Sequence, residues 1–491
     1  MKILVLELAR LGDIFQTWPA LRGLKRLYPE AQIEVLTRAR FEAALEGLDV
    51  ISKKRILPTR DIMASLLDPE MNVKEAHEKL GAFVAEFREE KYDWILNFSF
   101  SPLSSYLTHA LSHEKTKVSG YSRTSDGFLA IPDDMSAYVY AQVGVGRPNR
   151  FHLAEVFATL VGVDLQVSDW RAPKSMEPHP QAPDVLIHIG ASDNKKQISP
   201  VKWATILNQF LKISDVKIGL IGASGESALA EQIMASVPAE KIENFVGRTS
   251  LQELFSLIAG ARLLVGADSA PMHMASLTGT VCVNLSLARV NFWETGPRAP
   301  GSVVLRGEDE TDFASDKVAM AMKRALKREK QDLTAILSQE GTPSFWHLAP
   351  KDSDFEWNFI KAIYMGNDFP MNENEIFRDG IIRLADINLL MVEQIEAVQK
   401  GTDIQKVGGI IDRGEEIIET IGKLVPALAP LVRWYQTEKI RIGPDTREKL
   451  LERSLQVQNL LQKVLNLYLE SYGLTPADLQ AQSQDPQEVK K

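Results

Sequence analysis

Short apolar runs alternate with helical stretches over about the first 330 residues of this 491-residue chain. The runs at 2–8 and 263–265 contain almost no polar side chains, which is typical of strands buried on both faces of a parallel sheet. Parallel strands need crossover connections, and the intervening helices supply them. The alternation therefore predicts an α/β fold with doubly wound parallel sheets.

Changes in composition divide the chain into five predicted segments. A stretch rich in proline and polar residues reads as an extended linker between two α/β domains. The later part has helical periodicity and ends in a polar, low-complexity tail. We predict a Rossmann-like domain at 1–167, a linker at 168–184, a second Rossmann-like domain at 185–330, a helical extension at 331–478 and a disordered tail at 479–491.

Helix-breaking residues predict two interruptions. Pro19 is expected to kink or restart the first helix, because proline removes a backbone hydrogen bond from a helix interior. In the helical extension, Gly408, Gly409, Pro426 and Pro430 are expected to break the middle helical segment.

Charge and cysteine content exclude several classes of protein. The net charge of −9 argues against general nucleic-acid binding. Cys282 is the only cysteine, so a disulfide framework and a cysteine-based metal site are excluded. The chain starts directly with a strand-like run, and no apolar run reaches the length of a membrane span. We therefore expect a cytoplasmic protein.

The stretch at 263–279 (LLVGADSAPMHMASLTG) reads as a strand, a tight turn and a helix. Asp268 or Ser269 is expected to cap the helix, and Pro271 suits its first turn. Unpaired backbone N–H groups at a helix start carry the positive end of the dipole and can hold a phosphate. His273 lies in the first turn, where it can face the same ligand. The alternative is an ordinary strand–helix unit with a packed histidine.

Small-residue turns follow three strands of the second domain, at 190–192, 222–225 and 266–270. Turns at corresponding strand ends can bring backbone N–H groups close to an anionic ligand. Lys196 could add positive charge against a diphosphate, and Glu226 could accept hydrogen bonds from a ribose or base. The alternative is that the turns only satisfy backbone geometry and that Lys196 is a solvated surface residue.

Asp13 follows the first strand directly after Gly12. Ligands of doubly wound sheets bind outside the carboxyl ends of the strands, so a carboxylate here could act as a general base. The alternative is a helix N-cap. The stretch is not a GxGxxG fingerprint, and a nicotinamide-type site is not indicated.

Together these motifs resemble glycosyltransferase family 9, the heptosyltransferase-type enzymes with the GT-B fold. The motifs that carry the resemblance are RLGD at 10–13 with TWPAL at 17–21, GAS at 190–192 with Lys196 and Trp203, and DSAPMH at 268–273 with Ala275. The chain departs from the family at 198–199, where a Trp-Pro pair is common, and at 286–289, where a Gly-Pro-Thr loop is common. The second departure leaves the donor sugar open.

The resemblance implies two Rossmann-like domains facing across a cleft and a bacterial-type enzyme of lipopolysaccharide or surface-glycan synthesis. It implies inverting transfer of a sugar, heptose among the candidates, from a nucleotide-diphosphate donor to the hydroxyl of a glycan or glycolipid acceptor. No cofactor or metal is expected. Asp13 would be the catalytic base, and the donor-binding residues would be Gly12, Ser192, Lys196, Glu226, Asp268, Ser269, Ala270 and His273.

Two other functions remain open at this point. One is a different GT-B activity on nucleotide sugars, such as an epimerase or a hydrolase. The other is a non-catalytic GT-B scaffold that binds a partner through its helical extension. In either case the extension is expected to serve oligomerisation or partner binding, and peripheral association with the inner face of the membrane is compatible with the sequence. The acceptor and the oligomeric state are not fixed by the sequence.

Overall fold

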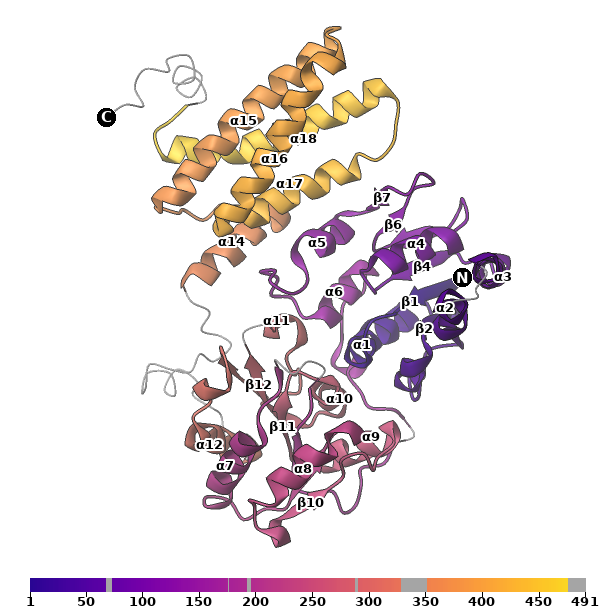
Figure 1. Cartoon of the computed structure of the whole chain (residues 1–491), viewed down its shortest axis with the longest axis vertical. Coiled ribbons are helices and arrows are strands. Elements are labelled where there is room, and N and C mark those ends of the chain that lie inside the picture. Colours follow the sequence, from indigo (N-terminus) through magenta and orange to yellow (C-terminus); the bar gives the residue numbers. More distant parts are fainter. Residues whose placement is uncertain (68–72, 175, 192–195, 288–289, 328–350, 476–491) are drawn as a thin grey trace. The chain divides into compact units, whose positions relative to one another are not determined.

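The computed structural model describes residues 1–67, 73–174, 176–191, 196–287, 290–327 and 351–475 (Figure 1). The chain forms two compact units, Met1–Gly120 with Gly144–Ala349 and Tyr121–Val143 with Pro350–Lys491. We call them the α/β unit and the helical unit. The predicted tail at 479–491, and Ser192 among the predicted site residues, lie outside the described residues.

The amino-terminal half of the α/β unit is a five-stranded parallel sheet in the order β3-β2-β1-β4-β5. The predicted strand at the amino terminus is confirmed as β1. The strands are β1 (Lys2–Leu6), β2 (Gln32–Arg38), β3 (Lys53–Leu57), β4 (Trp94–Asn97) and β5 (Lys117–Ser119). The helices are α1 (Leu11–Leu27), η1 (Ala39–Leu45), α2 (Thr59–Leu67), α3 (Val73–Glu89), α4 (Pro102–Leu111), α6 (Leu153–Leu160) and η2 (Val167–Asp169).

Strand β3 was not anticipated, because its sequence KKRIL carries three charged side chains. The structure buries one of them, Arg55, by pairing it. Its guanidinium donates to Glu34 at 2.6 Å and to Glu86 at 2.6 Å, and it also pairs with Glu90. A buried charge is tolerated when it is paired and hydrogen-bonded, so the partners on β2 and α3 make this edge strand possible.

Helix α1 runs from Leu11 to Leu27 through Pro19, so the helix does not restart there, as the sequence had suggested it could. Every residue from Ile14 to Leu24 is buried, and tertiary packing of this kind outweighs local helix propensity. Phe15 and Trp18 pack against Phe255 of the second domain, with ring centroids 5.3 and 5.8 Å apart. The helix therefore joins the two α/β domains.

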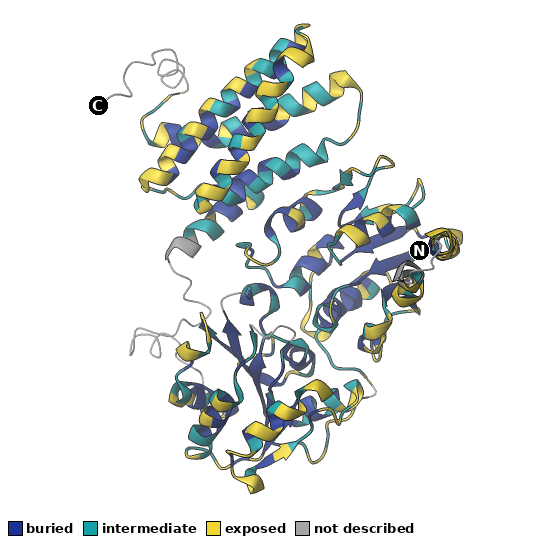
Figure 2. Ribbon diagram, viewed as in Figure 1, coloured by how far each residue is buried: buried dark blue, intermediate teal, exposed yellow. Residues whose placement is uncertain are grey.

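The second half of the α/β unit is a six-stranded parallel sheet in the order β10-β9-β8-β11-β12-β13. Figure 2 shows its central strands β11 and β12 as buried. Its strands are β8 (Val185–His188), β9 (Ile218–Ile221), β10 (Ile242–Asn244), β11 (Leu263–Ala267), β12 (Val281–Leu287) and β13 (Val303–Gly307). Its helices are α7 (Pro200–Leu211), η4 (Ser224–Glu226), α8 (Ser227–Met234), η5 (Ala239–Lys241), α9 (Leu251–Gly260), α10 (Ala270–Thr278), α11 (Phe292–Thr295), η6 (Glu310–Asp312) and α12 (Ser315–Leu326).

The helical unit is a bundle in which only one of the predicted breaks occurs. Gly408 and Gly409 lie inside a continuous α16, whereas the chain turns at Pro426, and Pro430 lies in the first turn of α17, where proline is tolerated. Its elements are β6 (Ser122–Arg123), β7 (Leu129–Ala130), α5 (Asp134–Gln142), α14 (Lys351–Met365), α15 (Glu375–Gln399), α16 (Ile404–Leu424), η7 (Pro426–Leu428), α17 (Ala429–Arg441) and α18 (Arg447–Ser471). Among the described helices of the whole chain, none is both long and apolar enough to cross a membrane.

The helical unit also includes residues 121–143, which our division of the sequence had placed in the first domain. Gln142 is buried, and its side-chain amide donates to the Tyr364 hydroxyl at 3.1 Å and to the Pro430 carbonyl at 3.0 Å. Arg441 donates to Asp134 at 2.7 Å. Helix α5 is thus a packed member of the bundle, although it lies more than 200 residues before it in sequence.

Candidate functional site

One cavity of about 790 Å³ in the α/β unit gathers every predicted site residue that the structure describes. Both halves of the unit contribute, through the turn after β1, the turns after β8 and β9, and the start of α10. Its predicted members are Gly12, Asp13, Lys196, Glu226, Asp268, Ser269, Ala270 and His273.

Gly12 lets the start of α1 approach the start of α10 closely. A β-carbon at Gly12 would lie 2.9 Å from His273 Cδ2 and 3.6 Å from Ala270 Cα. The contact with Ala270 would be ordinary, but the His273 ring would have to move away from an added β-carbon. The glycine therefore leaves room for the His273 ring at this point of the cavity.

Asp13 lines the cavity and stabilises the start of α1 at the same time. It is the third residue of the helix, and its Oδ2 accepts a hydrogen bond from the backbone N–H of Arg10 at 2.9 Å. Burial raises the pKa of Asp13, and the Arg10 N–H and the nearby His273 oppose that rise. A carboxylate with a raised pKa is a stronger base, so the structural role and the role predicted by resemblance are compatible.

The start of α10 has no side-chain cap, which corrects the sequence prediction. Ser269 occupies the N-cap position, but its hydroxyl interacts with the Ala267 carbonyl and with His188 Nδ1, each at 3.0 Å. Asp268 Oδ2 instead accepts from Lys196 Nζ at 3.2 Å. Pro271 lies in the first turn, as predicted. The backbone N–H groups at this helix start are thus not capped by either side chain, as an anion site requires.

Lys196 is held by Asp268 and is not a solvated surface lysine. The two side chains are 19% and 11% exposed. Asp268 Oδ1 is buried and has no hydrogen-bond partner among the residues that the structure describes. A buried, unsatisfied carboxylate oxygen is costly, so a ligand with a hydroxyl or amide donor near this atom would be stabilised.

His273 is buried, and the Gln16 side-chain amide lies 3.2 Å from its Nε2, within hydrogen-bond distance. Burial lowers the pKa of His273, against the opposing charges of Asp268 and Asp13. Nδ1 has no partner in the described chain. The lowered pKa favours a neutral imidazole at this wall of the cavity.

Glu226 explains why two of the predicted turns contain glycine. A β-carbon at Gly190 would lie 1.8 Å from Glu226 Oε1, and one at Gly222 would lie 2.4 Å from Oε2. The carboxylate accepts the Ala223 N–H at 2.7 Å, and burial raises its pKa. The turns therefore make room for an acidic side chain at the cavity, and one of their N–H groups already binds it.

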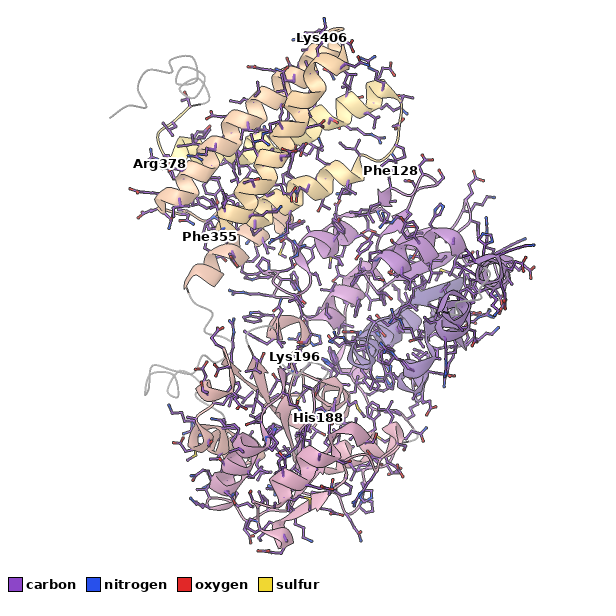
Figure 3. All side chains as sticks on the ribbon, viewed as in Figure 1. Phe128, His188, Lys196, Phe355, Arg378 and Lys406 are labelled. Carbon is purple, nitrogen blue, oxygen red and sulfur yellow. The ribbon has the colours of Figure 1, made fainter. Side chains whose placement is uncertain are left out.

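Sequence analysis missed Gln16, His188, Arg10 and Arg40, of which all but Gln16 line the cavity. Gln16 could have been found from its spacing of one helical turn after Gly12. His188 ends β8, and burial lowers its pKa to about 4, so it is neutral near pH 7. Figure 3 labels His188 and Lys196, both in the second half of the α/β unit.

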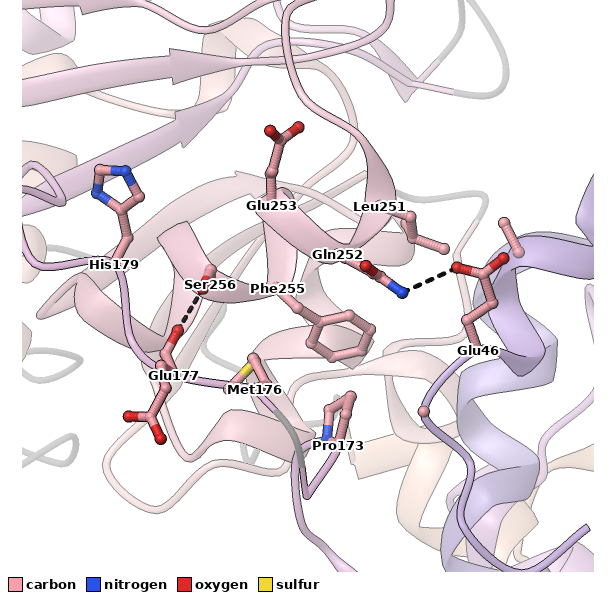
Figure 4. Close-up of a pocket in the computed structure, with 12 residues that line it drawn as sticks. Glu46, Pro173, Met176, Glu177, His179, Leu251, Gln252, Glu253, Phe255 and Ser256 are labelled. Carbon is pink, nitrogen blue, oxygen red and sulfur yellow. Dashed lines mark hydrogen bonds between the residues drawn. The ribbon is translucent and has the colours of Figure 1, made fainter.

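A smaller cavity of about 300 Å³ lies between η1, the linker and α9 (Figure 4). Gln252 donates to Glu46 at 3.1 Å, and the Ser256 hydroxyl donates to the Glu177 carbonyl. His179, predicted to be a linker residue, donates its backbone N–H to the Ser256 carbonyl at 2.9 Å. These contacts attach the linker to α9 and bring together none of the predicted site residues.

The sequence profile of glycosyltransferase family 9 (heptosyltransferase) matches residues 80–285. Lipopolysaccharide heptosyltransferase 1 of Campylobacter coli is 24% identical over 287 residues, which cover 56% of this chain and 80% of that protein. Lipopolysaccharide heptosyltransferase 3 of Escherichia coli K12 is 21% identical over 369 residues, or 70% of this chain and 96% of that protein.

Among solved structures, the E. coli heptosyltransferase WaaC with ADP superposes with a TM-score of 0.52 at 14% identity. The match covers 66% of this chain and all of that one. At this identity the likeness concerns the fold, and it confirms the predicted GT-B arrangement of two Rossmann-like domains. The share of this chain outside the match fits the presence of an additional helical region, which the structure confirms.

Proposed function

We propose that this chain transfers a sugar from a nucleoside-diphosphate donor to an acceptor hydroxyl with inversion, because the profile of glycosyltransferase family 9 matches residues 80–285 and the curated relatives are named heptosyltransferases. The observation that carries the proposal is that Asp13, Lys196, His273 and the uncapped start of α10 line a single cavity. An ADP-linked heptose is the first donor to test, since the relatives are named heptosyltransferases and WaaC binds ADP.

The start of α10 and Lys196 form the proposed seat of the diphosphate. Backbone N–H groups and the helix dipole favour the negative charge, and Lys196 lies beside them through its pairing with Asp268. The His273 imidazole, which lines the same cavity, would add a hydrogen bond to a phosphate oxygen. These interactions strengthen as the bond from sugar to phosphate breaks, because charge then grows on the leaving diphosphate.

Asp13 is the proposed base. The acceptor oxygen forms a bond to the anomeric carbon while the bond from that carbon to the diphosphate oxygen breaks. The acceptor proton passes to the Asp13 carboxylate, and the electron pair of the broken bond leaves with the diphosphate. One displacement from the opposite face inverts the anomeric centre.

The proposal requires no metal, because protein groups supply the positive charge that the leaving diphosphate needs. Activity should therefore survive EDTA. Loss of activity in EDTA with recovery on adding Mg²⁺ would contradict metal independence while leaving the transferase reaction standing.

The proposed acceptor is a glycan or glycolipid of lipopolysaccharide type, following the names of the relatives, and the proposed location is the cytoplasmic face of the membrane. The test is a product analysis with ADP-heptose and other nucleotide sugars, each with and without a lipopolysaccharide-core acceptor. A new glycosidic bond of inverted configuration is expected. Turnover of the donor alone, by epimerisation or hydrolysis, would favour a different nucleotide-sugar enzyme.

A further inference from the structure

A second connection between the two α/β domains lies beside the cavity. Residues 144–149, which we call the strap, pack against α11 of the second domain. Glu294 Oε1 accepts the backbone N–H of Gly144 at 2.9 Å and the side-chain amide of Asn149 at 3.0 Å. One carboxylate oxygen thus holds both ends of the strap.

Glu294 and Asn149 are both buried, at 5% and 0% exposure. Asn291, the N-cap of α11, adds two more bonds by donating its amide to the Asn149 carbonyl at 2.8 Å and to the Arg147 carbonyl at 3.3 Å. Removing the Glu294 carboxylate would leave the half-buried Gly144 N–H and the buried Asn149 amide without this acceptor, which is costly.

The strap presents one apolar side chain to the cavity. Val145 lines the same cavity as Asp13 and is 82% exposed. It lies between Gly144 and Gly146, whose φ angles are +121° and +71°. Two glycines in this region permit a conformation that other residues rarely adopt. Thr295, the neighbour of Glu294, lines the cavity too, so the connection brings one residue from each domain to it.

We propose that Glu294 is a positioning residue that fastens the strap so that Val145 contacts the substrate bound in the cavity. The identity of the substrate rests on the proposed transferase function, whereas the attachment of the strap by Glu294 does not depend on that function. In this proposal Val145 contacts the substrate, and Glu294 acts through Val145.

The surroundings of Glu294 indicate that the fastening depends on pH. Burial raises the pKa of Glu294 to about 7, against the bonds from Gly144, Asn149 and Asn291. The charged groups on the neighbouring elements are engaged elsewhere: Arg150 lies over the Trp293 ring, Arg306 lies over the Phe292 ring, and Arg298 pairs with Glu155. His152 is also near, with Nε2 3.2 Å from the Gly296 carbonyl, and burial holds its pKa well below the usual value.

The first experiment is amide hydrogen exchange on the full chain, read at Gly144. Glu294→Ala should speed exchange on the order of 10-fold, because a lost charge-assisted bond of about 1.4 kcal/mol corresponds to that factor. Glu294→Gln, which keeps a neutral acceptor oxygen, should give an intermediate rate, between those of the wild type and Glu294→Ala. Glu155→Gln is the matched control, since it removes a neighbouring, more exposed carboxylate. Unchanged exchange in Glu294→Ala would overturn the proposal.

Wild-type protein supplies the same test if Glu294→Ala does not fold. After correction for intrinsic rates, exchange at Gly144 should be several-fold faster at pH 6 than at pH 8, because the protonated carboxyl is a weaker acceptor. Glu294→Gln should show no such difference. Equal corrected rates in the wild type would count against the fastening.

The second experiment tests whether Val145 contacts the substrate or has only a structural role. Val145→Ser should raise KM for a substrate several-fold with kcat little changed, whereas Val167→Ser, at a 92% exposed valine of η2 outside the cavity, should do neither. If KM is unchanged by Val145→Ser, Val145 is not a contact residue. If the wild type transfers no sugar at all, the transferase proposal fails, while hydrogen exchange still decides the fastening.

Discussion

At the scale of single residues, Asp13 gives the sharpest prediction. Asp13→Asn should reduce turnover on the order of 10²-fold or more, because an amide cannot take the acceptor proton. The amide oxygen can still accept the Arg10 N–H, which holds the helix start. Donor binding by calorimetry and the melting temperature should therefore stay close to those of the wild type. Normal turnover by the folded variant would rule out Asp13 as the base.

The raised pKa of Glu294 predicts how the free energy of unfolding depends on pH. Its pKa is about 7 in the folded chain against an ordinary 4.5, so between these values the folded state binds more protons than the unfolded state. The free energy of unfolding should therefore fall as pH rises from about 4.5 to about 7 and be unaffected by this group above pH 7. The fall is on the order of 3 kcal/mol at most.

Denaturant titrations at several pH values would measure this dependence. Glu294→Gln cannot ionise and should flatten the slope between pH 5 and 7, whereas Glu155→Gln should leave it in place. A slope that persists in Glu294→Gln would assign the pH dependence to other groups.

At the scale of elements, the approach of α1 to α10 gives a further prediction. Gly12→Ala would place a β-carbon 2.9 Å from His273 Cδ2, so the His273 ring must shift by several tenths of an ångström. We expect nucleoside-diphosphate affinity to fall on the order of 10-fold, since His273 lines the proposed diphosphate site, while both sheets remain folded. Gly225→Ala, which has open space around it, is the control. Equal affinities for both variants would show that the approach does not shape the site.

The same elements show what could be read from the sequence. Strand β11, the start of α10 and the position of Asp13 followed from apolar periodicity and turn residues, which are local signals. The missing cap at Ser269 could not be predicted from local signals. His188 binds the Ser269 hydroxyl and Lys196 binds the Asp268 carboxylate, and both partners come from other parts of the chain. Strand β3 was missed for the same reason, since Arg55 is neutralised by partners on β2 and α3.

At the scale of the whole molecule, the sequence located a helical extension but not its first helix. Helix α5 is too short to show a clear helical period in the sequence, and the residues it packs against lie more than 200 positions later. The attachment of the strap could not be predicted for a related reason: Glu294 and Asn149 are 145 residues apart, and neither belongs to a motif. Long-range pairings of polar side chains are what the sequence analysis could not supply.

Truncation tests how far the inserted segment 121–143 depends on the rest of the helical unit. A chain ending at residue 330 keeps α5 but loses α14 and α17, which leaves Tyr138 and Gln142 without their partners and uncovers the face of α5 that packs on α17. Exposed apolar surface of this kind promotes association. We therefore expect the truncated chain to aggregate in size-exclusion chromatography, and the same chain with Tyr138→Ser and Val139→Ser to be monomeric.

If the donor site is confined to the α/β unit, the truncated chain that carries these two substitutions, the rescued chain, should bind nucleotide as the full chain does. A truncated chain that stays monomeric without the substitutions would show that α5 does not need the bundle, and a rescued chain that fails to bind would show that the site requires the helical unit.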